Sequence, residues 1–437
     1  MKTKLLFFLF LITSISFGQF NSSAPWMLDV SEEKKGNLSI GEIKSRFDAY
    51  WLTHDKNVKG SGYKPFMRWE YHWKNKTNPQ GMLLTPEEMW EAWRQKNQVK
   101  LQRSASSVLS PTSNWLPVGP STHTNTGSWS SGQGRVNIVY VDPSNPSTLY
   151  IGAPAGGIWK SSDNGINWLP LSDYLPQIGV SGIAVDQTNS NVIYITTGDK
   201  DALDTYSIGV LKSIDGGITW NTTGLTFTNT SSTAGDIIMN PTNNQALFCA
   251  TSEGLYKTIN GGTTWNIVQV GNFAKGSVRF KPGNPSTIYA VSNNSFYVST
   301  NSGATFSNIT SGLPINSGRM ILEVTPANQN VVYILSTNTD YSFQGLYKSV
   351  NSGSNWNVTL NTTDVLESNQ AWYDLALAVS NSNENEIYTG CLNVWKSSNG
   401  GNSFTKLNNW FEPTSLSYTH ADIHYLGFHG NKLFCGS

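Results

Sequence analysis

Charged residues are scarce in this chain. Lys, Arg, Asp and Glu together account for 13% of the 437 residues, and 29 basic residues balance 29 acidic ones. A protein that binds nucleic acid through its phosphates needs a basic surface, so this composition argues against that class of partner. Aromatic residues reach 12%, and many Asn, Ser, Thr and Gly residues stand where charged residues are usual.

Cysteine is also rare, and its spacing matches no metal-binding pattern. Cys249, Cys391 and Cys435 lie far apart and outside any Cys-x-x-Cys unit, so neither a zinc site nor an iron–sulfur site is indicated. All three lie in strand-like stretches, which favours buried free thiols. One disulfide in an oxidising compartment is the alternative.

Long apolar runs are missing except at the start of the chain. Leu5 to Phe17 is mostly apolar, follows Lys2 and Lys4, and ends in small residues before Gln19. Such a run is shorter than the ~20 residues that span a bilayer and is typical of a secretory signal peptide. We therefore predict a signal peptide over 1–18, no lipid anchor, no membrane span, and a secreted, extracellular or bacterial cell-surface location.

A short pattern recurs six times in the rest of the chain. Its frame is S/T-x-D/N-x-G-x-x-W/F, and the copies follow one another at intervals of 41 to 52 residues. The Asp or Asn of the frame is Asp163, Asp215, Asn260, Asn301, Asn351 and Asn399. A repeat of this length is typical of stacked supersecondary units, and β-propeller blades have about this length.

Each copy predicts a hairpin turn that its own side chains hold together. The Asp or Asn can accept hydrogen bonds from backbone N–H groups, Gly supplies a positive φ, and the aromatic residue can fold back and bury apolar surface. The pattern resembles the Asp-box, or BNR, repeat of sialidases, sortilin-type receptors and xyloglucan-cleaving glycosidases. This resemblance implies blades whose repeated turns lie on the outer side, away from the binding face.

Four strand-like stretches accompany each copy, so we predict an all-β propeller over 114–437 with six complete blades. Asn114 to Val118 resembles a fourth strand without its turn, which predicts ring closure by the N-terminal end. His420 to Phe428 and Lys432 to Cys435 resemble the first two strands of a seventh blade. A blade cut short in this way predicts that the sequence is part of a longer chain.

Residues 19–103 predict a helical, aromatic-rich segment before the propeller. A capping box at Ser39 to Glu42 begins one amphipathic helix, and Thr85 to Glu88 begins a second. Tyr63 to Glu70 is dense in aromatics, for which a binding role is the alternative to packing. Residues 104–113 read as a Ser-rich linker. The segment resembles the N-terminal part of exported bacterial proteins that use the type IX secretion route, which implies secretion machinery as a partner.

Polar residues near the start of each first strand are the candidate ligand-binding residues, because the innermost strands of a propeller meet around its central channel. They are Arg135, Asp236, Arg319, Asp374, His420, Asp422 and His424. The last three alternate along one expected strand, where they could ligate a metal ion or, in the interpretation that we favour, form a hydrogen-bonded polar layer.

Sialidase chemistry finds little support in these residues. Arg135, Arg279 and Arg319 are the arginines of the propeller, and three arginines would suit a carboxylate ligand. Arg279 lies closer to the following turn than the other two, however, and the F/Y-R-I-P signature of sialidases is absent.

Xyloglucanase chemistry meets a similar objection. The resemblance to that family implies a catalytic Asp before the Gly-Gly of blade one, where this chain has Pro154 and Ala155. Glycoside hydrolysis usually needs two carboxylates that flank the bond. Asp374 and Asp422 form the other candidate pair of catalytic carboxylates.

One loop of blade two is acidic. It carries Asp199, Asp201 and Asp204, and hard cations such as Ca²⁺ bind several oxygen ligands in loops of this kind. A structural Ca²⁺ site is therefore one interpretation, and a solvated acidic loop is the other. No other cofactor is indicated.

The favoured function is a secreted, non-catalytic propeller that binds a glycan or an extracellular protein. The alternative is a polysaccharide-acting glycoside hydrolase of the xyloglucanase-like type that uses Asp374, Asp422 or residues beyond position 437. A sialidase is the remote alternative.

Overall fold

The computed structural model describes residues 24–35, 37–58, 61–105, 134–176, 179–203 and 205–437. It contains two compact units, Met1–Glu88 and Met89–Ser437. The predicted signal peptide, most of the predicted linker and the predicted closing strand at 114–118 lie outside the described residues. Within the described ranges, every helix is too short or too polar to cross a membrane.

The first unit is helical. Its capping box is present as predicted, since Ser39 Oγ accepts the N–H of Glu42 at 3.2 Å and the Glu42 carboxylate accepts the N–H of Ser39 at 2.8 Å. Thr85 and Glu88 make the same pair of bonds at the start of the last helix. The helices are η1 (Pro25–Met27), α1 (Glu32–Lys35), α2 (Ile40–Trp51), α3 (Tyr63–Trp73) and α4 (Pro86–Ala105), which continues into the second unit.

The aromatic stretch of this unit is a helix, α3, which is not among the sequence-based predictions. Its apolar period is obscured by exposed aromatics such as Tyr71. Phe66 of α3 stacks on Phe47 of α2 with ring centroids 3.9 Å apart, and Trp26 and Trp69 join the same buried core. Packing within the first unit therefore accounts for much of the aromatic content of this stretch.

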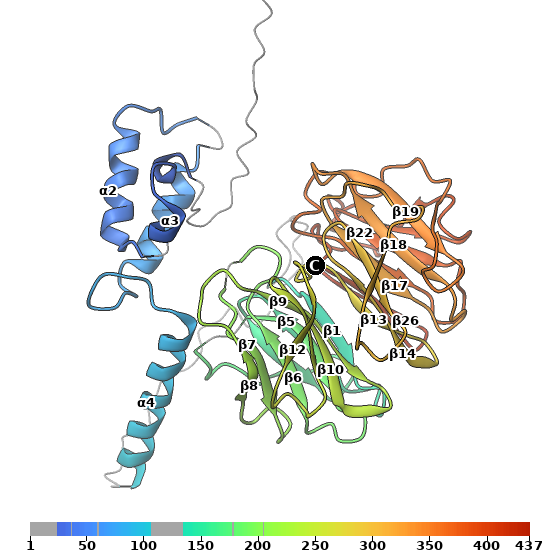
Figure 1. Ribbon diagram of the computed structural model, residues 1–437, viewed down its shortest axis with the longest axis horizontal. Coiled ribbons are helices and arrows are strands. Elements are labelled where there is room, and N and C mark those ends of the chain that lie inside the picture. Colours follow the sequence, from blue (N-terminus) through green and yellow to red (C-terminus); the bar gives the residue numbers. More distant parts are fainter. Residues whose placement is uncertain (1–23, 36, 59–60, 106–133, 177–178, 204) are drawn as a thin grey trace, which may run out of the picture. The chain divides into compact units, whose positions relative to one another are not determined.

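The second unit is a β-propeller of six four-stranded sheets and one two-stranded sheet (Figure 1). Blades one to three contain β1 (Ile138–Val141), β2 (Leu149–Ala153), β3 (Gly157–Ser161), β4 (Leu169–Pro170), β5 (Val180–Val185), β6 (Ile193–Thr197), β7 (Gly209–Ser213), β8 (Asn221–Thr226), β9 (Ala234–Asn240), β10 (Asn243–Thr251), β11 (Gly254–Thr258) and β12 (Asn266–Val270). Blades four and five contain β13 (Val278–Lys281), β14 (Asn284–Val291), β15 (Phe296–Ser299), β16 (Ser307–Ile309), β17 (Met320–Val324), β18 (Val332–Thr337), β19 (Phe343–Ser349) and β20 (Asn357–Val358). Blade six contains β21 (Ala376–Val379), β22 (Ile387–Gly390), β23 (Val394–Ser397) and β24 (Thr405–Lys406), and the partial seventh blade contains β25 (Tyr425–His429) and β26 (Lys432–Gly436).

The first strand of each blade is the innermost one. Successive strands of a blade pair antiparallel in chain order, and the first strands of neighbouring blades contact one another around the ring. β25 contacts both β21 and β1, and the N–H of Val136 donates to the carbonyl of Ser437 at 3.1 Å. These contacts confirm the predicted propeller of six blades with a partial seventh.

The repeated turn between the third and fourth strands has the same geometry in all six copies. In the first, Asp163 Oδ1 accepts Ser161 Oγ at 2.8 Å and the N–H of Asn167 at 2.9 Å, while Ser161 Oγ accepts the N–H of Gly165 at 2.8 Å. Gly165 has φ +87°, a conformation that Gly adopts without a steric penalty. The same three bonds recur in the other five turns.

Lysine residues on the third strands make a second repeated contact, which the repeated sequence frame does not predict. In five blades, a Lys of the third strand places its ammonium 5.0 to 5.8 Å from the centre of an aromatic ring on the second strand. Lys212 also donates to the carbonyl of Gly261 at 3.0 Å, in the repeated turn of the next blade. This lysine therefore joins a blade core to the neighbouring turn.

The cores of the second unit lie between neighbouring sheets. The first one includes Tyr150, Ile193, Leu211 and Trp220, and Trp90 of α4 belongs to it. Trp93 of α4 donates its indole N–H to the carbonyl of Tyr174 at 2.7 Å. Cys249 and Cys391 are buried free thiols, as predicted, whereas Cys435 is free and exposed.

Candidate functional site

The starts of the innermost strands meet around residues 198–203 of blade two, which we call the hub loop. Its three central side chains are buried, with exposed fractions of 0% for Asp199, 9% for Lys200 and 2% for Asp201. Burying ionised side chains is costly unless partners of opposite charge surround them. The partners of the hub loop come from several other blades.

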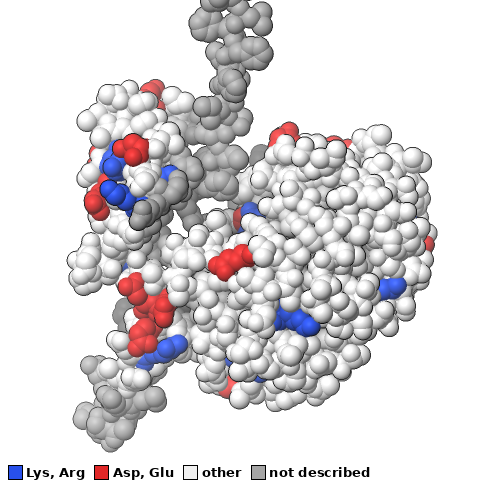
Figure 2. Space-filling model, viewed as in Figure 1, with Lys and Arg blue, Asp and Glu red and all other residues white. Residues whose placement is uncertain are grey.

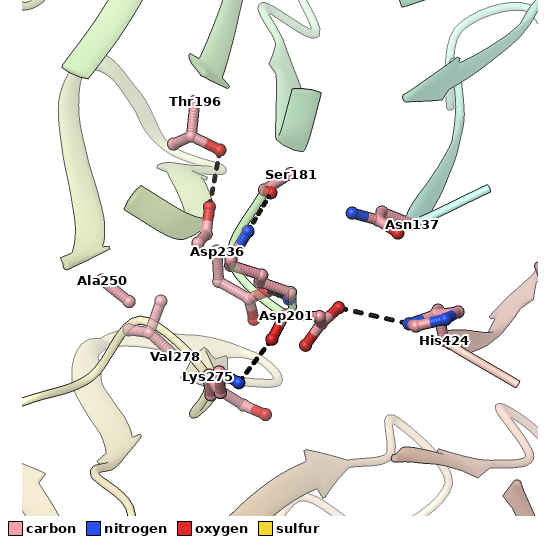
Figure 3. A network of polar contacts seen from close by, with 12 residues as sticks. Asn137, Ser181, Thr196, Asp201, Asp236, Ala250, Lys275, Val278 and His424 are labelled. Atoms are coloured by element: carbon pink, nitrogen blue, oxygen red, sulfur yellow. Dashed lines mark hydrogen bonds and ion pairs between the residues drawn. The ribbon is translucent and has the colours of Figure 1, made fainter. Parts of the chain in front are cut away.

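Asp201 is the centre of this network (Figure 3). Its carboxylate accepts the Arg319 guanidinium at 3.1 Å and contacts His424 Nδ1 at 3.2 Å, and its backbone carbonyl accepts Lys275 Nζ at 2.6 Å. Burial alone would raise the pKa of the Asp201 carboxyl, but Arg319 and His424 outweigh burial and hold that pKa below its usual range. Asp201 is therefore ionised and links blades two, four, five and seven.

Asp199 and Lys200 extend the hub to two further blades. Arg135, which precedes β1, donates to the Asp199 carboxylate at 2.5 Å. Lys200 reaches Asp236 of β9 at 3.5 Å. Asp236 also accepts Arg279 of β13 at 2.7 Å, so that charges alternate from blade to blade.

The hub brings together four of the predicted ligand-binding residues, namely Arg135, Asp236, Arg319 and His424. Each of them already contacts a charged group of the chain itself. These residues lie where the sequence places them, at the starts of first strands, and their contacts hold the ring together.

The calcium prediction rests on the same loop. Arg135 contacts the Asp199 carboxylate, and Arg319 contacts the Asp201 carboxylate. Among the described residues, no three His, Cys, Asp or Glu side chains form a group that could hold a metal ion. Asp204 lies outside the described residues, so the calcium site stays a prediction.

A second cluster lies between the two longest connections of the propeller, residues 359–375 and 407–424. The Gln370 amide donates to Asp374 Oδ2 at 3.0 Å and to Asp422 Oδ1 at 2.7 Å. Cys391 Sγ contacts Asp374 Oδ1 at 3.3 Å. The two candidate catalytic carboxylates are therefore joined by one amide group.

The environment of the two carboxylates differs. Asp374 is 0% exposed, and burial raises the pKa of its carboxyl to about 7, an effect that the Gln370 amide opposes and the Asp422 charge reinforces. Asp422 is half-buried and has φ +68°. Near neutral pH, Asp374 can hold a proton, but its burial keeps it away from a bound chain.

The expected strand at His420 to Phe428 begins later, at Tyr425. The left-handed backbone of Asp422 interrupts the extended conformation, so the three polar residues do not alternate on one strand face. His420 is exposed, Asp422 contacts Gln370, and His424 contacts Asp201. The polar layer at this point consists of His424 alone and not of all three residues.

The loop of blade one in which the resemblance to xyloglucanases implies a catalytic Asp is hydrogen-bonded to blade two. The carbonyl of Pro154 accepts Thr205 Oγ1 at 2.5 Å, so this loop is tied to blade two. Pro154 and Ala155 bring no carboxylate to this position.

Aromatic residues lie on both connections that carry the second cluster. Tyr373 packs edge-on against His424 with ring centroids 4.6 Å apart, and the Arg135 guanidinium lies 5.0 Å from the centre of the Tyr373 ring. Trp410 and Phe411 lie on the other connection, and Phe411 is 52% exposed. The two connections therefore present flat apolar side chains next to polar ones.

Several residues of these two clusters were not predicted from the sequence. Lys200, Lys275 and Gln370 lie in irregular connections and belong to no motif. The acidic loop was the one feature of the sequence that could have predicted the hub. A Lys between two Asp residues is compatible with charge pairing inside the protein as well as with cation binding.

Comparisons with known proteins indicate the fold and a similarity to xyloglucanases over part of the chain. No protein-family model matches the chain. A xyloglucanase from Paenibacillus sp. is 24% identical over 167 residues, which are 36% of this chain and 16% of that protein. The solved GH74 enzyme of Niastella koreensis is 21% identical, with a TM-score of 0.51, over 70% of this chain and 52% of its own.

Two other solved GH74 enzymes give the same result. An ancestral GH74 enzyme has a TM-score of 0.54 at 20% identity, over 70% of this chain and 44% of its own. The GH74 xyloglucanase from Xanthomonas campestris has a TM-score of 0.53 at 17% identity, over 70% and 51%. The chain thus spans about half the length of these enzymes, and it is a β-propeller with structural similarity to GH74 xyloglucanases.

Proposed function

We propose that this protein is a secreted propeller that binds a neutral glycan without cleaving it. The observation that carries this proposal is that several carboxylates of the candidate site are paired with basic groups or buried, and that an Asp expected at a catalytic position is absent. Those of the hub loop contact Arg or His side chains, and Asp374 is 0% exposed. Pro154 and Ala155 stand where the resemblance to xyloglucanases implies a catalytic Asp.

The binding surface in this proposal lies over residues 359–375 and 407–424. Aromatic rings supply large, rigid apolar area there, and neighbouring polar side chains can bond hydroxyl groups. Figure 2 shows only scattered charged side chains over the propeller surface that faces the viewer. A weakly charged surface of this kind suits an uncharged, hydroxyl-rich partner. The similar xyloglucanases suggest xyloglucan as the first polysaccharide to test.

A glycoside hydrolase that uses Asp374 and Asp422 is the second candidate. It is favoured by the raised pKa of Asp374, about 7, since a general acid must hold a proton at neutral pH and its partner must not. Gln370 joins the two carboxyl groups. Opening of the 359–375 connection would have to expose Asp374 before it could act.

The test uses the full chain with soluble xyloglucan and a panel of other polysaccharides. We expect saturable binding by affinity electrophoresis or calorimetry and no new reducing ends. Exchange of Phe411 for Ala should weaken binding about tenfold or more, because a lost aromatic contact removes apolar area at the centre of an interface.

Asp374→Asn and Asp422→Asn separate the two candidates. Asp163→Asn is the matched control, because four of the six repeated turns already carry Asn at that position. If reducing ends appear with the wild-type protein and with Asp163→Asn but not with Asp374→Asn, the protein is a hydrolase and the binding-only proposal is wrong.

A further inference from the structure

The central channel of the propeller is a blind cavity. It has a volume of about 730 Å³ and is lined by the first strands of all seven blades. At one end the hub loop closes it, with Asp199, Lys200 and Asp201 buried. At the other end the lining residues Gln187, Pro241 and Thr242 are exposed. The channel therefore opens on the side away from the hub.

Among the described residues that line the cavity, two carry a buried polar atom without a partner, and both atoms lie at the closed end. They are Asn137 Oδ1 and His424 Nε2, and both residues line the cavity. Asn137 is 1% exposed and His424 is 7% exposed. A buried polar atom without a partner costs about 1–3 kcal/mol, so this end of the channel is built to receive a hydrogen-bonding group.

The neighbouring contacts identify Asn137 Oδ1 as an acceptor. Asn137 Nδ2 faces the Asp199 carboxylate at 3.5 Å, and a flipped amide would place oxygen against oxygen, so Oδ1 is the free atom. His424 Nδ1 faces the ionised Asp201, which leaves Nε2 as the ring nitrogen without a partner among the described residues. The missing group must therefore donate a hydrogen bond to Asn137 Oδ1.

The charge of the lining selects among donors. Five Lys and Arg side chains line the cavity against two carboxylates, Asp236 and Glu323. This excess of positive charge among the lining residues disfavours an ammonium ligand, and the acceptor atom Asn137 Oδ1 at the closed end disfavours an anion. A hydroxyl group fits both conditions, since it donates and carries no charge. Tyr140 and Phe428 add aromatic surface to the wall.

We propose that the channel binds a neutral polyol of monosaccharide size, which enters from the open end, donates one hydroxyl hydrogen to Asn137 Oδ1 and forms a hydrogen bond with His424 Nε2 through another hydroxyl group. The volume lies within the usual range of small-molecule sites, about 300–1,000 Å³. This site is separate from the glycan surface over residues 359–375 and 407–424, and either can exist without the other.

The test measures binding of glucose, galactose, xylose and myo-inositol to the full chain by saturation-transfer NMR and calorimetry. Two variants probe the two ends of the channel. Asn137→Ala removes an acceptor that has no partner in the described part of the chain, and Thr242→Trp fills the exposed mouth. Ser144→Trp is the matched control, because Ser144 occupies the same position in the turn of blade one but does not line the cavity.

We expect at least one of these polyols to bind, with affinity reduced about tenfold or more by Asn137→Ala and Thr242→Trp and unchanged by Ser144→Trp. Binding of xyloglucan to the outer surface should be the same in all three variants. The proposal is overturned if no polyol binds, if binding survives Thr242→Trp, or if crystals soaked in the polyol hold only water at Asn137 and His424.

Discussion

At the scale of single residues, Asp374 stands out because it is an ionisable group that is fully buried. Its pKa of about 7 in the folded chain lies well above the ordinary value of an aspartate, about 3.9. Between these two values the folded state binds more protons than the unfolded state. Stability therefore falls as pH rises from about 4 to about 7.

Asp374→Asn should remove this pH dependence. At pH 8 the variant should be more stable than the wild type, by up to about 4 kcal/mol, since each unit of pKa difference corresponds to about 1.4 kcal/mol. At pH 4 the two proteins should be alike. Urea unfolding at pH 4, 6 and 8 measures the difference, with the half-buried Asp422→Asn as control. Parallel pH profiles for wild type and Asp374→Asn would contradict the prediction.

At the scale of the element, the repeated turn shows how much a sequence frame can predict. The Asp or Asn and the Gly take the roles expected of them, and the Ser or Thr adds two hydrogen bonds that were not predicted from the sequence. The seventh position of the frame was missed, although it is Asn, Thr or Ser in every copy and its side chain bonds the Asp or Asn. Its chemistry varies too much to stand out in a single sequence.

Asn351 offers a clean test of the turn. Its Oδ1 accepts Ser349 Oγ at 2.9 Å and the N–H of Asn355 at 3.1 Å. Asn351→Ala should lower the free energy of unfolding by about 1–2 kcal/mol, because both bonds are lost. Asn351→Asp keeps the acceptor oxygen and should change stability by less than about 0.5 kcal/mol. Equal losses in the two variants, measured by chemical denaturation, would show that the side-chain acceptor is unimportant.

At the scale of the whole molecule, the hub loop connects blades that are far apart in the sequence. Removing one partner from a buried ion pair leaves the other charge unpaired and costs about 3–5 kcal/mol. Asp201→Asn does this to Arg319 and also changes the group that His424 Nδ1 contacts. The exposed Asp173→Asn is the matched control for the same chemical change.

The expected result for Asp201→Asn is a loss of about 3–5 kcal/mol at pH 7. Because the pKa of Asp201 is lowered in the folded chain, its contribution is present above about pH 4 and is lost as pH falls further. The gap between wild type and variant should therefore shrink in acid. Calorimetry at pH 7 and pH 3 measures it, and a gap that stays constant or widens in acid would rule out the ionised pair as its cause.

The fold and the site differ in how far the sequence predicts them. Blade number and register follow from local patterns, because each turn is held by residues two to four positions apart. The hub could not be predicted in the same way. The contacts of Asp201 with Arg319 and His424 depend on how the ring closes. The left-handed Asp422, which delays the start of the expected strand to Tyr425, has no signature in its neighbours.

The span of the hub contacts also has a consequence for the order of folding. Asp201 is 118 residues from Arg319 and 223 residues from His424, whereas the repeated turns close over a few positions. Contacts between distant residues form slowly, because a long loop must first be closed. Single blades should therefore become structured while the chain is still being made. The contact of Asp201 with His424 cannot form before residue 424 is present, so we expect the hub to be completed late in folding.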